Sequence, residues 1–240
     1  MKVVALTDSG RRENNEDNFF KYANDKLFGG FIADGMGGHN KGDYASKLAC
    51  DVIKDYIMTH FELTMDSFDI SELARAALIK ANDKIFQMSV KNPICKGMGT
   101  TATLALVFDE WLITAHVGDS RVYVINDEKI VKVTHDHSFV DELIEKGAIT
   151  EEEAKRHPKR NYITRAVGPE RSIVVDVNTQ RYNGETVLVC SDGLWAFLDE
   201  EDIKKTVLES ETLDQAAENL IELALLKNSN DNISVVLFKR

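Results

Sequence analysis

Cysteine and proline are both scarce in this sequence. The 240 residues contain three cysteines, at positions 50, 95 and 190, and no two of them form a CxxC pair. A disulfide framework and a zinc ribbon are therefore not expected. The three prolines stand at 93, 158 and 169, and no repeat, linker or low-complexity segment divides the chain. We expect a single domain over residues 1–240, large enough to bury a continuous core without crosslinks.

Long apolar runs and an excess of positive charge are missing as well. The apolar stretch at residues 3–6 is too short for a signal peptide, and no later run is long enough to span a bilayer. The chain has 29 Lys and Arg against 40 Asp and Glu, which gives a net charge of −11. Nucleic acid is disfavoured as a ligand because its phosphates require a basic surface. We expect a cytoplasmic monomer that binds neither nucleic acid nor membranes.

The apolar residues predict helices and strands that arrive in blocks. Helices are expected at 45–57, 73–88, 136–147, from a capping box at 150–153, and twice more between 191 and 224. Strands are expected at 3–6, 18–22, 27–33, 101–108, 111–117, 121–125, 129–133, 173–178, 186–190 and 233–238. The breaks between the central strands are short, which favours antiparallel pairing. This order indicates an α+β fold in which helices cover stacked sheets.

Aspartates recur in one particular local setting. Each follows an apolar segment or precedes one, and has a small or turn-forming neighbour; the four are Asp34, Asp119, Asp192 and Asp231. A further acidic pair, Glu16 and Asp17, stands just before a predicted strand. Any one of these residues alone is typical of an ordinary turn. Together they predict a cluster, because loops at one edge of a sheet converge and commonly carry function.

The negative charge of such a cluster would have to be neutralised. Two carboxylates about 4 Å apart repel by roughly 4 kcal/mol at an effective dielectric constant near 20. Either some of them take up protons or a cation binds, and few Lys or Arg residues stand beside these aspartates in the sequence. All-oxygen ligands suit Mg²⁺ or Mn²⁺ better than zinc or copper. Calcium stays possible, although the scattered ligands are unlike a local calcium-binding loop.

Six short motifs occur in a fixed order. They are GRRENNED at 10–17, ADGMGGH at 33–39, GMGTT at 97–101, HVGDSR at 116–121, CSDGL at 190–194 and NDN at 230–232. This series resembles that of the metal-dependent protein phosphatases, the type 2C family, in its compact bacterial form. The resemblance extends from about residue 7 to about residue 236. It implies a serine/threonine protein phosphatase with a four-layer αββα sandwich, in which helices flank two antiparallel sheets and metals bind at one end.

The resemblance also implies a ligand set for two Mg²⁺ or Mn²⁺ ions. Asp34 would bridge both ions, with Asp192 and Asp231 completing the first and the Gly35 carbonyl joining the second. Glu16 and Asp17 would act near the second ion, directly or through water. Asp119 matches an aspartate that helps to hold a third, weaker metal together with Asp192.

Two further residues are expected to act on the substrate. The resemblance assigns phosphate binding to Arg12, whose guanidinium fork fits two phosphate oxygens; the alternative is an exposed surface charge, and Arg11 is the weaker candidate. His39 is the candidate general acid for the leaving oxygen, because imidazole titrates in the useful range. Met36 stands where the animal-type pattern has histidine, so His39 could instead contact substrate or belong to an ordinary loop.

The remaining histidines are expected to be less important. His116 lies within a predicted strand, where a packed or hydrogen-bonded side chain is expected. Residues 134–168 resemble the mobile flap of bacterial family members, which is thought to influence substrate access. The basic cluster at 155–160 could meet an acidic phosphopeptide or could simply be solvated charge.

The expected chemistry is direct hydrolysis. A metal-activated water would attack phosphorus in line, without a covalent enzyme intermediate. No cysteine lies in a Cys-x5-Arg loop. The partners would be phosphorylated proteins, and the enzyme would oppose a bacterial Ser/Thr kinase. Two other classes of function remain open: a phosphatase-like binding module without activity, and a two-metal nuclease, which the acidic balance disfavours.

Overall fold

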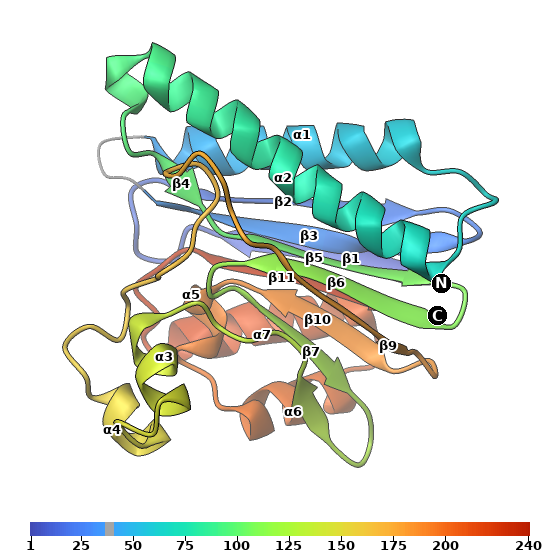
Figure 1. Cartoon of the computed structure of the whole chain (residues 1–240). Helices are drawn as coiled ribbons and strands as arrows, with labels where there is room; N and C mark the ends of the chain where they lie inside the picture. Colours follow the sequence, from blue (N-terminus) through green and yellow to red (C-terminus); the bar gives the residue numbers. More distant parts are fainter. Residues whose placement is uncertain (37–40) are drawn as a thin grey trace.

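The structure is a computed structural model that describes residues 1–36 and 41–240. Two antiparallel sheets are stacked face to face, with helices on both outer sides (Figure 1). The first sheet has the order β1 (Lys2–Asp8), β11 (Ile233–Lys239), β10 (Thr186–Cys190), β7 (Arg121–Ile125) and β8 (Ile130–Lys132). The second has the order β2 (Asp17–Ala23), β3 (Leu27–Met36), β5 (Ala102–Phe108), β6 (Trp111–Val117) and β9 (Asp176–Arg181).

The helices complete four layers. Two long helices, α1 (Gly42–His60) and α2 (Ser67–Lys91), pack on the second sheet. On the first sheet pack α5 (Asp192–Trp195), α6 (Glu200–Glu209) and α7 (Leu213–Leu226). Two short helices, α3 (Phe139–Glu145) and α4 (Glu151–Lys155), stand apart from both layers within residues 134–168, which we call the flap (Figure 1). The predicted αββα sandwich is confirmed.

Three apolar clusters hold the layers together. One lies under α1 and α2, one under α6 and α7, and one between the two sheets. Because both sheets are covered on both faces, the central strands are buried on both faces, as in β5, where all seven residues are buried. Among the described residues, none of the helices has the length and hydropathy needed to cross a membrane.

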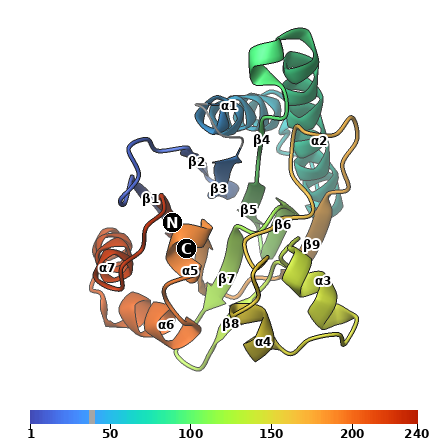
Figure 2. The same ribbon diagram turned by 90° about the vertical axis from the view of Figure 1, so that its left-hand side faces the viewer.

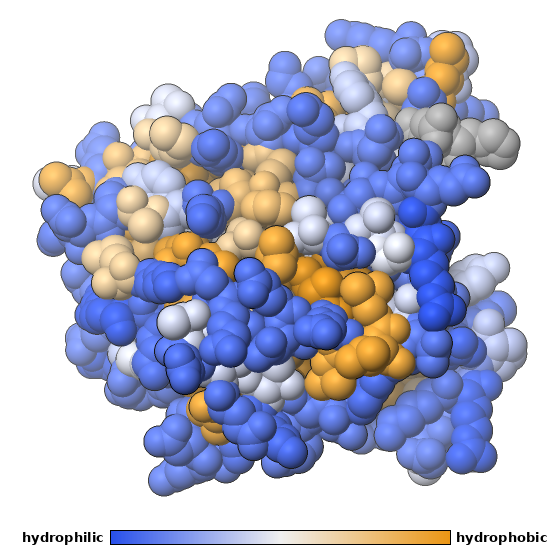
Figure 3. Space-filling view, turned by 180° about the vertical axis from the view of Figure 1, so that it is seen from behind, coloured by the Kyte–Doolittle hydropathy of each residue, from blue (hydrophilic) through white to orange (hydrophobic). Residues whose placement is uncertain are grey.

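The strands β1 and β2 form the edges of the two sheets on the side away from the flap helices α3 and α4 (Figure 2). At this edge Val3, Ala5 and Phe19 pack on the inter-sheet cluster while staying partly exposed. Seen from behind, the molecule is largely hydrophilic with an apolar area near its centre (Figure 3).

Several boundaries differ from the sequence prediction. The strand expected at 173–178 is β9, which begins only at Asp176, where it pairs with His116 of β6. The two-residue strand β4 (Gly99–Thr100) and the short helices at 93–95 and α5 were not predicted.

Candidate active site

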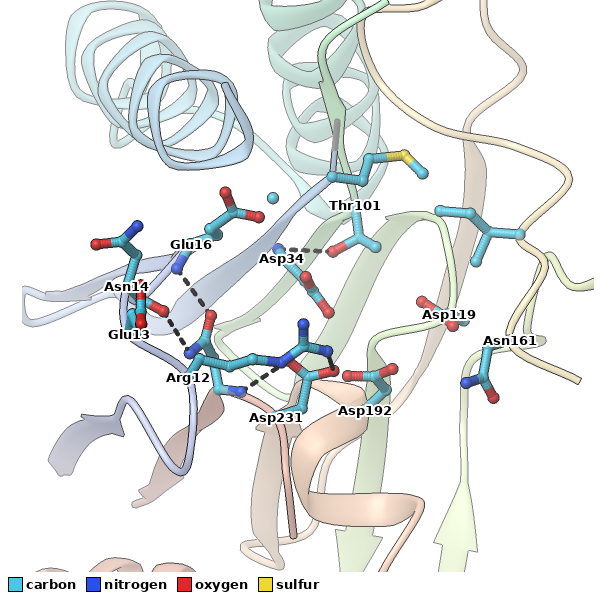
Figure 4. A pocket seen from close by; sticks show the side chains of 14 residues that line it. Arg12, Glu13, Asn14, Glu16, Asp34, Thr101, Asp119, Asn161, Asp192 and Asp231 are labelled. Carbon is cyan, nitrogen blue, oxygen red and sulfur yellow. Dashed lines mark hydrogen bonds and ion pairs between the residues drawn. The ribbon is translucent and has the colours of Figure 1, made fainter. Parts of the chain in front are cut away.

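The predicted acidic residues converge at one end of the sandwich. A cavity of about 550 Å³ opens there (Figure 4). It is lined by Arg12, Glu13, Asn14, Glu16, Asp34, Gly35, Met36, Thr101, Asp119, Asn161, Ile163, Asp192, Asp231 and Asn232. Its carboxylates come from five separate segments, at the ends of β3 and β6, at the start of α5, and before β2 and β11. Of the predicted ligands, only Asp17 is not in this lining.

Asp34 is fixed by two threonines of the neighbouring strands. Its N–H donates to Thr101 Oγ1 at 2.9 Å, and its carbonyl accepts from Thr101 N and from Thr100 Oγ1, both at 2.8 Å. Thr101 Oγ1 also pairs with Ser120 Oγ at 2.8 Å. The two turns that carry Asp34 and Asp119 are therefore connected through one side chain. Although these threonines belong to a recognised motif, sequence reasoning gave them no role.

Asn232 connects the two ends of the chain at the cavity. Its Oδ1 accepts from Glu16 N at 2.8 Å, and its Nδ2 donates to the carbonyls of Ser9 and Asn14, each at 3.0 Å. The loop that carries Arg12 and Glu16 is thereby held against the start of β11. This was also missed, because the partners lie more than 200 residues away in the sequence.

Burial and mutual repulsion raise the pKa values of these carboxyl groups. Burial, followed by the charges of Asp17 and Asp192, raises the pKa of Asp34 well above its ordinary value. Burial and Asp192 do the same to the pKa of Asp119, and burial and Asp231 raise the pKa of Asp192 to about 6. Groups arranged in this way take up either protons or cations.

Asp17 lies behind the cavity wall. It pairs with Asp34 across β2 and β3, is 6% exposed, and accepts from Ser191 Oγ at 2.8 Å. Its other oxygen, Oδ1, is buried with no hydrogen-bond partner in the described part of the chain, and burial raises the pKa of Asp17 to about 7. Glu16, its neighbour, faces the cavity instead, where burial and Asp43 raise its pKa (Figure 4).

The donor set fits a hard divalent cation. It consists of carboxylate and carbonyl oxygens, with the orphaned Asp17 Oδ1 close behind them. Among residues 1–36 and 41–240, no three His, Cys, Asp or Glu side chains stand ready in metal-binding geometry. Asp231 is turned to Arg12 and to the N–H of Asn232.

Gly35 allows the end of β3 to touch the start of α1. A Cβ at this position would lie 2.2 Å from the Gly42 carbonyl oxygen, so no other residue fits. This close approach brings the backbone of Gly35 into the cavity wall, as its predicted role as a carbonyl ligand requires.

Arg12 reaches over the cavity from the first loop. Its Nη2 lies 2.8 Å from Asp231 Oδ2, its Nε donates to the Asn230 carbonyl at 3.0 Å, and its side chain is 56% exposed. Arg11 points elsewhere: it donates to Asn228 Oδ1 at 2.9 Å and is not in the lining. Of the two arginines, only Arg12 lies at the cavity, where a phosphate-binding residue would have to be.

The histidines differ in their positions. His39 lies outside the described residues. His116 is 2% exposed and pairs with Thr103 Oγ1 at 2.9 Å, so the expected packed side chain is confirmed; burial lowers its pKa to about 3. His137, which the sequence did not single out, accepts from Gly118 N at 3.1 Å and donates to Asp176 at 3.0 Å. It therefore ties the base of the flap to the turn before Asp119.

Comparison with known proteins agrees with this geometry. Residues 9–224 match the family model described as protein phosphatase 2C. A relative from Listeria innocua, "Serine/threonine phosphatase stp", is 35% identical over 244 residues, covering 100% of this chain and 96% of the relative.

Solved structures are similar over the same extent. Serine/threonine phosphatase Stp1 from Staphylococcus aureus superposes with a TM-score of 0.93 at 35% identity, covering 100% of this chain and 94% of that one. The catalytic domain of the serine threonine protein phosphatase PstP, solved in complex with two manganese ions, has a TM-score of 0.82 at 32% identity, covering 98% and 96%.

Proposed function

This chain belongs to the protein phosphatase 2C family and is a metal-dependent serine/threonine protein phosphatase, and we propose that it hydrolyses phosphoserine and phosphothreonine esters in the carboxylate cavity. The observation that carries this placement is the meeting of carboxylates from five segments with one arginine in the same cavity. Neither the composition nor any single motif requires that convergence.

The acidic residues of the site would then hold the metal ions. Bound Mg²⁺ or Mn²⁺ would supply Lewis acidity and lower the pKa of a water toward neutrality. Asp34 would be shared between two ions, Asp192 and Asp231 would complete one site, and the Gly35 carbonyl the other. Glu16 lines the cavity and would act at the second ion, and Asp17 would act from behind the wall, through water or by its field. PstP, with its two manganese ions, supports this pair.

Two side chains of this chain would act on the substrate: one would hold its phosphate and the other would protonate its leaving oxygen. Arg12, which lies next to Asp231, would bind two phosphate oxygens with its fork. We assign proton donation to the leaving serine or threonine oxygen to His39, in the segment that follows Asp34 and Gly35 in the sequence.

Arg12→Ala should raise KM for a phosphothreonine peptide by about tenfold and change kcat much less, because the phosphate is held in both the ground and transition states. Steady-state kinetics measure this, with Arg11→Ala as the matched control, which should behave as wild type. Equal KM values for the wild type and Arg12→Ala would show that Arg12 is an exposed surface charge without a role in phosphate binding.

Asp119 is proposed to hold a third, weaker ion together with Asp192. Support comes from its position: it is 7% exposed, lines the cavity, and has a pKa raised by burial and by Asp192. Asp119→Asn should lower kcat by about 10- to 100-fold while calorimetry still shows two tight ions. A variant that melts earlier but keeps its kcat would show that Asp119 only stabilises its turn.

We also propose a cellular setting. The substrates are phosphoproteins made by a Ser/Thr kinase of a bacterial cytoplasm, and the enzyme works as a monomer there. The bacterial origin of the relatives and their printed functions support this setting.

The proposal is tested by phosphate release from a phosphothreonine peptide. Activity should require Mn²⁺ or Mg²⁺, vanish on exhaustive chelation and return with metal. Undiminished hydrolysis after chelation would refute the metal mechanism. No hydrolysis of peptide or p-nitrophenyl phosphate with metal would indicate a binding module, and cleavage of DNA instead would indicate a nuclease.

A further inference from the structure

A second groove continues from the catalytic cavity. Its volume is about 830 Å³, and it shares Asp119, Asn161 and Asp192 with the cavity. It lies over β7 and β8, with the flap helices α3 and α4 on one side and the α5–α6 corner on the other (Figure 2). A chain that leaves the cavity past the three shared residues enters this groove.

The two walls of the groove are apolar where they face each other. Val140, Ile144 and Ala154 come from the flap, and Trp195, Phe197 and Leu198 come from the opposite corner. Val140, Ala154 and Leu198 are buried, whereas Ile144, Trp195 and Phe197 are half-buried and keep apolar surface toward the groove. Covering that surface would be favourable in water.

The floor of the groove is held by contacts of Arg121. The Arg121 guanidinium lies 3.5 Å from the centroid of the Trp195 ring, and it donates to Tyr123 Oη at 3.0 Å and to Asp136 at 2.5 Å. Asp136 is buried and also accepts from Lys132 at 3.3 Å. These contacts join α5 to β7 below the groove.

Most cations around the groove are already paired within the protein. Lys132 and Arg121 share Asp136, Lys155 pairs with Glu152, and Lys227 pairs with Asp202. These four cations therefore offer no free positive charge to a ligand, and the facing apolar walls remain as a surface for one.

We infer that this groove binds an apolar side chain of the substrate polypeptide close to the phosphorylated residue. The inference rests on the proposed function, because the phosphate in the cavity is what brings the polypeptide to the groove. A substrate with a large aliphatic or aromatic residue at the matching distance gains contact with Ile144 and Phe197. A substrate with alanine there does not.

The test uses phosphothreonine peptides in which leucine replaces alanine at each position on either side of the phosphothreonine. Leucine at one or two matching positions should raise kcat/KM by about tenfold. Ile144→Asp should remove that preference and leave hydrolysis of p-nitrophenyl phosphate, which has no flanking chain, unchanged. Ile94→Asp is the matched control, since Ile94 is 70% exposed and is not in the groove lining. Phe197→Ser gives a second variant if Ile144→Asp melts early.

The outcomes separate the inference from the proposed function. Hydrolysis of p-nitrophenyl phosphate without hydrolysis of any phosphopeptide would refute the protein-phosphatase assignment. Phosphopeptide hydrolysis with equal rates at every leucine position would overturn the groove inference alone. A change in oligomeric state on light scattering, with the peptide preference intact in both variants, would overturn it as well and assign the groove to contact between copies.

Discussion

Replacing Asp34 by asparagine is expected to lower kcat on a phosphothreonine peptide by on the order of a thousandfold. The charges of Asp17, Asp192, Asp119 and Asp231 all raise the pKa of Asp34. An amide in its place keeps the size of the side chain and its backbone contacts to the two threonines but loses the anionic oxygens that two ions would share.

Three measurements make this result specific. Calorimetry should show that the variant no longer binds Mn²⁺ tightly. The metal-free variant should be at least as stable as wild type, because one repelling charge is gone. Asp25→Asn, at an exposed position outside the cavity lining, is the control and should keep full activity. Wild-type turnover in Asp34→Asn would mean that the metals bind elsewhere.

Asp17→Asn is expected to stabilise the metal-free protein at pH 8. The pKa of Asp17 is raised to about 7 in the folded state, mainly by burial, against about 4 in an unfolded chain. The folded state therefore retains a proton that the unfolded state loses, so stability falls as pH rises from about 4 to 7 and stays lower above 7. With that group removed, the free energy of unfolding at pH 8 should rise by a few kcal/mol, or about 5–10 °C in Tm.

The pH dependence distinguishes this effect from a change in packing. The gain in Tm over wild type should shrink by more than half between pH 8 and pH 5, because Asp17 is then protonated in the folded wild type. His116 and His137 have lowered pKa values and act in the opposite direction on acidification, but they are present in both proteins and cancel in the difference. Thermal melts in chelator measure it, and a gain of equal size at both pH values would contradict the electrostatic explanation.

The sequence predicted the convergence of the carboxylates because each aspartate stood at the end of an apolar segment. In a covered sheet such segments are strands, and strand ends at one edge of the sandwich face the same solvent. Asp34, Asp119, Asp192 and Asp231 all line one cavity for this reason.

Glu16 and Asp17 show where local pattern alone was insufficient. They were given one shared role, yet Glu16, which precedes β2, lines the cavity, whereas Asp17, the first residue of β2, is buried against Ser191. The position of Ser191 beside Asp17 could not be predicted from the sequence.

Spacing along the sequence could not predict the structural roles of Thr101, Asn232 and His137. Each acts by hydrogen-bonding the backbone or side chains of segments distant in the sequence, such as the N–H of Asp34, the carbonyl of Asn14 or the N–H of Gly118. Those partners exist only once the sheets are stacked. The start of β9 was misplaced for the same reason, because it depends on pairing with β6 rather than on the apolar run before Asp176.

The most direct test of the metal assignment is an anomalous difference map from crystals grown with Mn²⁺. The map should show two strong peaks at the end of the sandwich, both within coordination distance of the Asp34 carboxylate, one also contacting Asp192 and Asp231 and the other the Gly35 carbonyl. Peaks only at other positions, or an empty cavity in crystals of a protein that is active with Mn²⁺, would contradict the account.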